Sequence, residues 1–557
     1  MGGSRYTPTA FDLRVPIGDA WVDLQSGKLT VQSEKYMTNL NQLLATLGGI
    51  QVVPSGLDIT SALQGGINQA ISQGGGVVVL PAGSYTISSV SIPANAPPIS
   101  IIGQGWSTKL TRGATLAAGV GVFDIRGSYV TLSDFILDGG VTVPVGLRYN
   151  ADFSTPINPN DPMAPSLTGN TSVWVHGPTS KVSIYRVLFQ HAGGYSVLLD
   201  ATTGDVSDIE IVECWLFNNR PTLFGVNPGQ LIYGSWNGGI LAKSDGRSAM
   251  GAQSGVVSGL LVQACNFQRN NGNCLWSHGY GFNRFNSEFR YVGNRFLDCG
   301  LDGILVDLVS GGIVSGNVMR RIGYTTMDDS SQSVPRWLVG LNATGIDSGV
   351  VKGVPYVGNS LTSVNGGMID MDGHGDGSLE GNTLRIPYPN EPEYLEDQIA
   401  ITGPNNNGNN SYGLNFGNTY SVQDGCTRVP VCGNAFINLP AGSIRGYSCR
   451  FISIESNLFD IPAVTTFAPI QIGPQGGGQF QRCHDVRISH NHVQWSPAAP
   501  APFVLEDDSL SGGNPFTAGE KNYVFGNNPI IGNGNPVEFQ KAAGSGSTVY
   551  GANVWFP

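Results

Sequence analysis

An acidic segment near the middle of the chain combines residue types that can cleave sugars or bind cations. Residues 366–376 read Gly-Gly-Met-Ile-Asp-Met-Asp-Gly-His-Gly-Asp. Because side chains alternate along a strand, Asp370 and Asp372 would share one face while the intervening apolar residues occupy the other. His374 and Asp376 follow directly. So much charge on a short segment indicates a reaction, a cation site or a solvated strand edge.

Two carboxyl groups on one face of a strand suit the cleavage of a glycosidic bond. Positions i and i+2 are roughly 6.7 Å apart. This spacing is compatible with the carboxylate separations of glycosidases, about 5 Å in retaining and about 6.5–9.5 Å in inverting enzymes. An acid whose pKa is raised by its neighbours would protonate the glycosidic oxygen, and a second carboxylate would act as base or nucleophile. The alternatives are solvated acids or a Ca²⁺ site on Asp370, Asp372 and Asp376, although the segment lacks EF-hand spacing.

A repeated asparagine followed by apolar residues indicates the elements that would position these acids. Clear copies of this signature begin at Asn266, Asn294, Asn317, Asn359, Asn382, Asn434, Asn457 and Asn491. Several neighbouring copies, such as Asn294 and Asn317, are 23 residues apart. A period in the twenties, with short strands and no intervening helices, is typical of one coil of a solenoid. Asparagine tolerates the left-handed backbone of a tight turn, and stacked copies can share amide hydrogen bonds.

Alignment of the coils on this signature places several polar residues in one outward row. Asp307 and Asp372 fall at the same offset from their asparagines, and His278 and Asp200 fall at nearly the same offset in earlier coils. Successive coils of a parallel sheet are roughly 4.8 Å apart. The alignment therefore predicts a ladder of ionisable side chains, with Asp307, Asp370, Asp372 and His374 as the catalytic candidates. Residues 324–337 and 387–412 are predicted to be loops inserted into coils, where binding residues tend to lie.

Composition excludes some classes of partner. The net charge is −11, charged residues are only 12%, and glycine is 78 of 557 residues. No basic run is present, so we expect no nucleic-acid partner. No apolar run approaches the roughly 18 residues that span a bilayer, and the N-terminus lacks the apolar core of a secretory signal. An extracellular site of action would therefore require another route out of the cell, such as lysis.

The eight cysteines show no zinc-binding spacing, and most stand among apolar or small residues. We expect buried free thiols within strands, which fits folding in a reducing compartment. Disulfides are the alternative.

The N-terminal third is predicted to begin with two short helices. Leu40, Leu43, Leu44 and Leu47 have helical spacing and end at a Gly-Gly pair. A second amphipathic helix is expected over 60–73, capped by Thr60 or Ser61 and ended by three glycines.

The residues after this helix carry a family resemblance. Residues 77–88 read VVVLPAGSYTIS and residues 100–110 read SIIGQGWSTKL. This opening resembles the pectate-lyase-like right-handed parallel β-helix family, and especially the bacteriophage tailspikes that carry this domain. The resemblance implies an all-β, single-stranded right-handed parallel β-helix, with a helix covering its open end. We expect an N-terminal attachment segment over 1–50, the β-helix over 51–496 and a C-terminal capping or trimerisation segment over 497–557.

The resemblance also implies a function. A tailspike-like protein would be a homotrimer in the virion, joined to the phage baseplate or tail through its N-terminus, and would act outside the host cell. Its partner would be a bacterial surface polysaccharide, a capsule or O-antigen, which it would cleave by glycoside hydrolysis. The Gly-His-Gly at 373–375 is similar to a polygalacturonase motif and implies that His374 assists the acids. No cofactor or metal is expected, with Ca²⁺ as the alternative noted above.

Sugar binding needs aromatic faces and planar donors. The candidates near the same coils are Trp276, His278, Tyr280, Arg284, Tyr324 and Trp337. A lyase is the second prediction: His278 with Tyr280 would remove a proton from a uronic acid, and Arg284, Arg320 or Arg321 would neutralise its carboxylate. A purely adhesive spike is the third.

Overall fold

The computed structural model describes most of the strands and their nearby turns. The described residues are 48–113, 120–140, 171–192, 194–217, 219, 224–227, 230–232, 239–244, 255–270, 272–278, 285–300, 302–326, 337–339, 344–364, 366–394, 397, 412–417, 425–440, 442–446, 449–461, 470–472, 483–495, 503–506, 523–526, 528–531, 537–540, 548–549 and 554–556. The predicted leucine-rich helix before residue 48, and any attachment segment there, lie outside this set.

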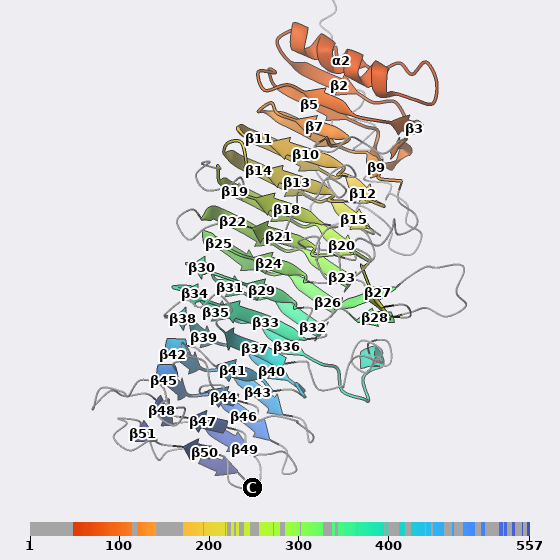
Figure 1. Cartoon of the computed structure of the whole chain (residues 1–557). Coiled ribbons are helices and arrows are strands. Elements are labelled where there is room, and N and C mark those ends of the chain that lie inside the picture. Colours follow the sequence, from red (N-terminus) through yellow and green to blue (C-terminus); the bar gives the residue numbers. More distant parts are fainter. Residues whose placement is uncertain are drawn as a thin grey trace, which may run out of the picture.

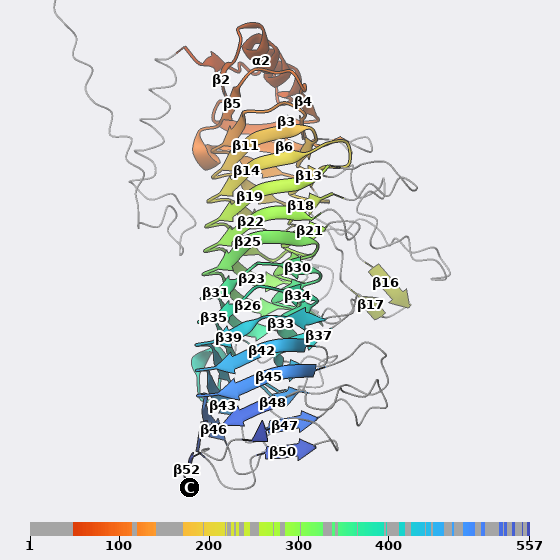
Figure 2. The same cartoon turned by 90° about the vertical axis from the view of Figure 1, so that its left-hand side faces the viewer.

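Each coil of the chain crosses three parallel sheets in the same order. In one coil, β22 (Asn286–Val292) lies in a 19-stranded sheet, β23 (Arg295–Cys299) in a 15-stranded sheet and β24 (Ile304–Val306) in a 14-stranded sheet, as counted over the described residues. The next coil begins with β25 (Val309–Ser315), which pairs in parallel with β22. Figures 1 and 2 show these coils stacked into one rod. The predicted parallel β-helix is confirmed.

The 14-stranded sheet is the one that carries the acids. Its strands are β4 (Val90–Ile92), β7 (Phe123–Ile125), β10 (Val173–His176), β13 (Val197–Asp200), β18 (Ile240–Lys243), β21 (Leu275–His278), β24 (Ile304–Val306), β29 (Ile346–Ser348), β33 (Gly367–Asp372), β37 (Tyr412–Gly417), β41 (Ile444–Gly446), β44 (Ile470–Ile472), β47 (Phe503–Glu506) and β50 (Val537–Gln540).

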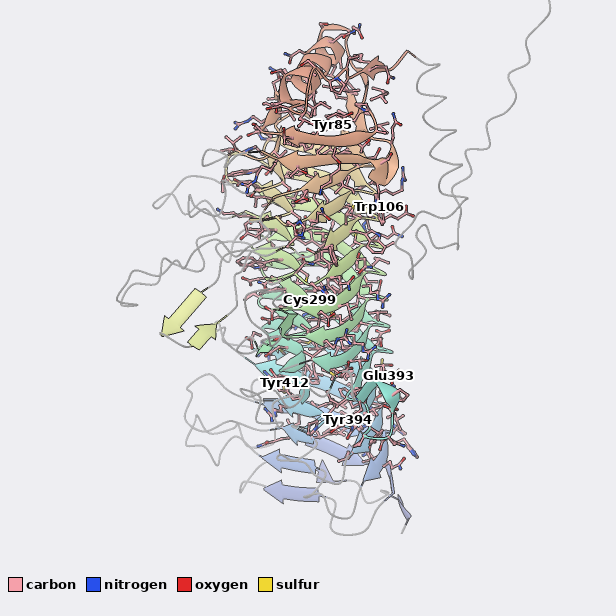
Figure 3. The ribbon with its side chains drawn as sticks, turned by 90° about the vertical axis from the view of Figure 1, so that its right-hand side faces the viewer. Tyr85, Trp106, Cys299, Glu393, Tyr394 and Tyr412 are labelled. Atoms are coloured by element: carbon pink, nitrogen blue, oxygen red, sulfur yellow. The ribbon has the colours of Figure 1, made fainter. Side chains whose placement is uncertain are left out.

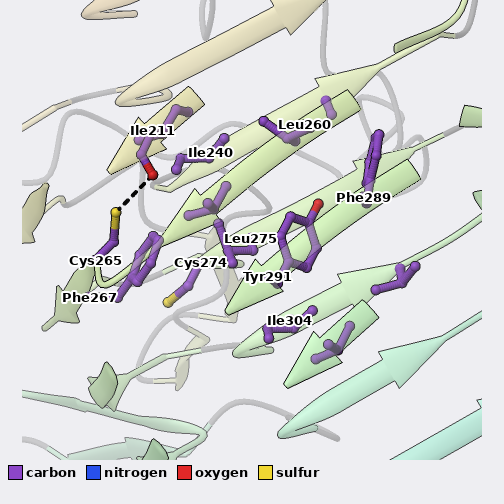
Figure 4. Close-up of a cluster of buried hydrophobic side chains, with 14 of the residues drawn as sticks. Ile211, Ile240, Leu260, Cys265, Phe267, Cys274, Leu275, Phe289, Tyr291 and Ile304 are labelled. Carbon is purple, nitrogen blue, oxygen red and sulfur yellow. Dashed lines mark hydrogen bonds between the residues drawn. The ribbon is translucent and has the colours of Figure 1, made fainter. Parts of the chain in front are cut away.

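The core is a continuous apolar column inside the coils. Inward residues of all three sheets, such as Leu275, Phe289 and Ile304, are almost completely buried in it (Figure 4). Aromatic rings stack between coils, as Phe267 does on Phe296 at 4.8 Å. The seven cysteines with described side chains, all except Cys483, are free and six of them are buried, so the expected buried free thiols are confirmed for these six.

The asparagine signature forms a hydrogen-bonded ladder, as predicted. Each Nδ2 donates to the Oδ1 of the next coil at 2.9–3.0 Å along Asn294, Asn317, Asn359, Asn382, Asn434, Asn457, Asn491 and Asn528. Of the two reasons given for asparagine, the shared amide hydrogen bonds are confirmed, whereas the left-handed backbone was wrong. The preceding residue takes the left-handed conformation, as Gly293 does with φ 64°. Asparagine is instead required because its amide both donates and accepts along the stack.

The segments that connect one sheet to the next differ in length according to which two sheets they join. Every ladder asparagine lies in a two-residue connection from the 19- to the 15-stranded sheet, such as Gly293-Asn294. The connections leading into the 14-stranded sheet are long in several coils, for example residues 139–172, 218–239 and 386–411. Variable segments thus adjoin the 14-stranded sheet, which marks it as the candidate functional face.

The helix α2 (Thr60–Ser72) lies at the N-terminal end of the rod, where it covers the first coil (Figure 1). Leu63, Ile67 and Ala70 bury its apolar face in the core. The helix was predicted over 60–73, but its expected cap was wrong. Ile59 is the capping residue by position, and Asp58 Oδ1 accepts the Thr60 N–H at 2.8 Å instead.

Two inserted hairpins and the C-terminal coils complete the described structure. The ends of the predicted loop at 324–337 form an antiparallel hairpin of β27 (Tyr324–Thr326) and β28 (Trp337–Val339), and β16 (Phe224–Asn227) pairs likewise with β17 (Gln230–Ile232). Parallel pairing continues beyond residue 496 to β52 (Val554–Phe556). Among the described residues no helix has the length and apolar character needed to cross a membrane.

Candidate active site

Between β10 and β33, the outward side chains of the 14-stranded sheet change from apolar to acidic along the rod. Strand pairing places one outward residue of each coil above the next, and we call this row the central column. From β10 to β41 the central column reads Trp174, Leu198, Leu241, Trp276, Leu305, Asp347, Asp370, Asn415 and Arg445. Inward neighbours such as Ile346 and Ile369 are fully buried in the core. Two adjacent aspartates therefore face outward where the apolar half ends.

Asp347 and Asp370 form the centre of the site. They are Cα partners on β29 and β33, so their backbones are roughly 4.8 Å apart. Both side chains are partly exposed, which leaves the carboxyl groups accessible to a ligand. Among the described residues, neither forms an ion pair with a lysine, arginine or histidine.

Desolvation and neighbouring acids act together on Asp347. Burial, followed by the charges of Asp302, Asp370, Asp372 and Asp307, raises the pKa of Asp347 well above its usual range. Such surroundings favour the protonated form of a carboxyl group. This is the form that a general acid requires.

Asp370 is held by hydrogen-bond donors from the next coil. Tyr412 Oη donates to its Oδ2 at 2.8 Å, and Asn415 Nδ2 donates to its Oδ1 at 2.8 Å. Burial raises the pKa of Asp370, while these two donors oppose the rise. Asp347 has no such opposing donors among the causes of its shift. Two adjacent acids with different surroundings are suited to separate acid and base roles.

Tyr412 reaches Asp370 because a glycine leaves room for its ring. Tyr412 pairs with Gly367 on β33, and a Cβ added to Gly367 would lie 2.7 Å from Tyr412 Oη. The Arg445 guanidinium lies 5.0 Å from the centre of the same ring. Burial and the charge of Asp370 raise the pKa of Tyr412, so its phenol remains a donor. Figure 3 labels Tyr412 on the coil surface.

Asp302 is a third acid beside this pair. It precedes β24 and is only 7% exposed, and its Oδ1 accepts the Thr344 N–H at 2.7 Å. Burial raises the pKa of Asp302 to about 7, with the Thr344 N–H opposing the rise and the charge of Asp370 adding to it.

A second outward row contains most of the predicted ladder. Strand pairing, continued by one residue beyond β24 and β29, gives the order Asp200, Lys243, His278, Asp307, Gly349 and Asp372. The predicted stacking of Asp200, His278, Asp307 and Asp372 on one side of the rod is therefore confirmed for the backbone. Gly349 separates Asp307 from Asp372, so these two acids are not neighbours.

His374 lies away from the acids that it was predicted to assist. It belongs to β34 (His374–Gly375) in the 19-stranded sheet, where it is completely buried and its ring centre is 5.2 Å from that of Tyr356. Burial lowers its pKa to about 4, so the ring is neutral. Gly373, with φ 97°, turns the chain out of the acid-bearing strand immediately before it. We therefore leave His374 out of the catalytic group proposed below.

Of the predicted sugar-binding residues, only Trp276 has a described side chain. Trp276 belongs to the central column, is 3% exposed, and packs in an apolar cluster with Leu241 and Trp174. Its ring faces are thus covered. The side chains of His278, Tyr280, Arg284, Tyr324 and Trp337 lie outside the described residues.

Arg320 and Arg321 are not available to neutralise a substrate carboxylate beside the acids. Both lie on β26 (Val318–Ile322) in the 15-stranded sheet. Arg320 pairs with Asp397 at 3.0 Å, and Arg321 pairs with Asp298 and Asp397. This part of the lyase prediction is wrong, because both arginines already form ion pairs with the buried Asp397.

The structure does not bring together the three acids of the calcium alternative. Asp376 follows β34 in the 19-stranded sheet and pairs with Arg428, whereas Asp370 and Asp372 face outward from the 14-stranded sheet. The three acids do not converge. Among the described residues, no group of three or more histidines, cysteines or acids is placed to hold a metal ion.

Several site residues were missed at the level of sequence: Asp302, Asp347, Tyr412, Asn415 and Arg445. The inserted segment after β27 breaks the regular offset from Asn317, so counting did not reach Asp347. A usable signal was the repeated Ile-Asp pair, Ile346-Asp347 and Ile369-Asp370, which the structure aligns.

Comparisons with known proteins identify related folds only. No protein-family model matches the sequence, and no curated protein does either. Among solved structures, ORF18 of Geobacillus virus E2 is 15% identical with a TM-score of 0.40, and the match covers 66% of this chain but only 63% of that protein. The A-module of mannuronan C-5 epimerase AlgE6 from Azotobacter vinelandii is 13% identical with a TM-score of 0.43, over 92% of this chain and 99% of the module.

The Dettilon tailspike protein gp208 is a further similar structure, 11% identical with a TM-score of 0.34, over 91% of this chain and 71% of that one. A tailspike is thus among the similar solved structures, as the sequence resemblance led us to expect. Likeness at this level concerns the fold, and a fold hosts many activities. The function must therefore be argued from the site.

Proposed function

We propose that this protein hydrolyses a glycosidic bond of a bacterial surface polysaccharide, a capsule or O-antigen. The observation that carries the proposal is the pairing of Asp347 with Asp370 on neighbouring outward strands, without a basic partner among the described residues. Carboxyl groups on adjacent strands of one face lie at roughly the spacing of a glycosidase pair.

In this proposal Asp347 is the general acid and Asp370 is the base or nucleophile. The protonated Asp347 donates its proton to the glycosidic oxygen as the bond from that oxygen to the anomeric carbon breaks. If Asp370 is the base, it takes a proton from the water that attacks the anomeric carbon. If it is the nucleophile, it first forms an ester that water then opens, with Asp347 acting as base. Either route adds one water across the bond. Asp307 and Asp372 help to keep Asp347 protonated.

The resemblance to phage tailspikes supports the wider setting of this proposal. It supports a homotrimer in the virion that binds the host surface and is joined to the tail through its N-terminal segment. These features go with the polysaccharide substrate and stay proposals.

The test is digestion of purified capsules and O-antigens. Hydrolysis predicts new reducing ends without the ultraviolet absorbance of an unsaturated uronate. Asp347→Asn and Asp370→Asn should each lower the rate by about 10²-fold or more, whereas Asp376→Asn, which changes an exposed acid beside another sheet, should retain it. Full turnover by Asp370→Asn would overturn the proposal, and binding without any cleavage would indicate an adhesin.

A lyase is the second candidate, supported by Arg445 next to Tyr412 at the C-terminal end of the site. In that reaction a base removes the proton beside a uronate carboxylate, which a cation must neutralise. The raised pKa of Tyr412 makes it a poor base, and the surrounding acids would repel a uronate. Products with the unsaturated chromophore would establish this alternative.

A further inference from the structure

We propose that the sugar unit held against Asp347 and Asp370 carries no negative charge, and is a neutral sugar or an amino sugar. This inference rests on the proposed hydrolytic function and assigns the class of sugar that the site accepts at the bond it cleaves.

The first observation is that several buried acids elsewhere have basic partners, while Asp302, Asp347 and Asp370 have none among the described residues. Asp124, Asp134, Asp138, Asp298 and Asp397 each lie within 3.2 Å of a lysine or arginine nitrogen. Within the described part of the chain, the hydrogen-bond donors to Asp302 and Asp370 are uncharged: a backbone N–H for Asp302, and a phenol, a side-chain amide and the Met371 backbone N–H for Asp370. The charged groups that shift the pKa of Asp347 are, among the described residues, all acids.

The second observation is the position of these three acids. They come from neighbouring coils of one face, with Asp347 and Asp370 partly exposed. Among the described residues, a ligand at the acid pair would therefore contact carboxyl groups before a lysine or arginine. A sugar carboxylate roughly 6 Å from one ionised aspartate would bind on the order of a hundredfold more weakly at an effective dielectric of about 20. The ammonium group of an amino sugar at the same place would bind more tightly, because the ionised aspartate attracts it.

The third observation is the position of Arg445, the cation of the central column between β10 and β41, which lies to one side of the acid pair. Arg445 is aligned with Asn415, one coil beyond Asp370 and two beyond Asp347, and its guanidinium packs on the Tyr412 ring. An acidic sugar in the same polymer would thus be accommodated toward Arg445, away from the bond that is cleaved. We therefore expect the site to accept or reject an acidic sugar according to its position in the polysaccharide, and not according to the total charge of the polymer.

The experiment uses the polysaccharide that the protein cleaves in the assay above. The sugars at both new chain ends are identified by mass spectrometry and NMR, and the polymer is then digested again after chemical reduction of its uronic acids to neutral sugars. A neutral or amino sugar at the new reducing end, with cleavage retained after reduction, supports the inference. A uronic acid at that end, or cleavage abolished by reduction, overturns it.

A variant provides an independent arm. Asp302→Asn removes one carboxyl group next to the pair, and should raise the rate on an acidic polymer relative to its reduced form by about tenfold. Asp376→Asn should leave this ratio unchanged. A ratio that is identical in Asp302→Asn and the unmodified protein would contradict the inference. Absence of cleavage of any polymer by the unmodified protein would instead overturn the proposed hydrolytic function, which distinguishes the two failures.

Discussion

Two groups of aspartates, one packed against the 15-stranded sheet and the other on the 14-stranded sheet, differ in whether a cation neutralises them. Against the 15-stranded sheet, Asp397 of the segment that follows β36 (Thr383–Arg385) is completely buried, and it accepts hydrogen bonds from Arg320 at 3.0–3.2 Å and from Ser363 at 2.6 Å. On the 14-stranded sheet, Asp347 and Asp370 face each other without a cation among the described residues. The first group is electrostatically satisfied, whereas the second is not.

The difference separates a structural acid from a functional one. A buried carboxylate that is paired and hydrogen-bonded can fix a segment in place, and Asp397 does so for the segment that follows β36 (Thr383–Arg385). Acids that repel one another cost stability, and such local conflicts are concentrated at functional sites. The apparent flaw in the 14-stranded sheet is therefore the best guide to its chemistry.

The largest effect is expected from Asp347→Asn. An amide cannot donate an acidic proton to the leaving oxygen, so activity should fall by about 10²–10⁴-fold while the fold is retained. Release of reducing ends would measure the activity, and circular dichroism would show whether the fold is retained. If Asp347→Asn kept most of its activity, the unpaired acids would lose their catalytic interpretation.

The matching substitution in the first group is Asp397→Ala, which removes an acid that is paired with two arginines. It leaves Arg320 and Arg321 partly unpaired, and we expect a loss of about 3–5 kcal/mol in the free energy of unfolding. Denaturant unfolding would measure it. Glu393→Ala is the matched control, because Glu393 forms an exposed pair with Arg385 and should cost less than about 1 kcal/mol. Figure 3 shows Glu393 and Tyr412 at opposite edges of the stack. Equal losses in the two variants would remove the distinction.

Asp302→Asn should stabilise the protein at alkaline pH. The pKa of Asp302 is raised to about 7 in the fold from a usual value of 3.8. The folded state therefore binds this proton more tightly, and the stability it contributes is lost as pH rises from about 4 to about 7. We expect the variant to gain on the order of 1–3 kcal/mol at pH 8, and nothing near pH 4. Thermal unfolding at both pH values tests this, and a gain at both would mean that ionisation is not the cause.

Tyr412→Phe should have the smallest effect. Loss of the phenol removes a donor that favours the ionised Asp370, so the pKa of Asp370 rises and the acidic limb of kcat/KM moves to higher pH by about one unit. A uniform fall in rate without this shift would indicate only disturbed packing. Gly367→Ala, which crowds the same ring, should shift the limb in the same direction.

The fold was predictable from sequence because its rules are local. The two-residue turn, the asparagine and the apolar residues after it recur in the coils from Asn294 to Asn528, and each repeat specifies the same local structure. The alternation that places Asp370 and Asp372 on one face likewise needs only the period of a strand. These predictions required no knowledge of distant contacts.

The site was only partly predictable because coils differ in length. Asp347 can be aligned with Asp370 only when the segment inserted after β27 is left out of the residue count. Tyr412 likewise follows a long insertion. His374 was misjudged because a positive φ at Gly373 carries the chain from one sheet to the next. A histidine beside acids in sequence can thus be packed in the core.

The uninterrupted row of asparagine amides has a mechanical consequence. Each interior amide is hydrogen-bonded to the coils on both sides, but a terminal one lacks one of these neighbours. Loss of order should therefore advance inward from a frayed end, one coil at a time, rather than start in the middle of the rod. The acid pair lies many coils from either end, so it should be among the last regions to unwind.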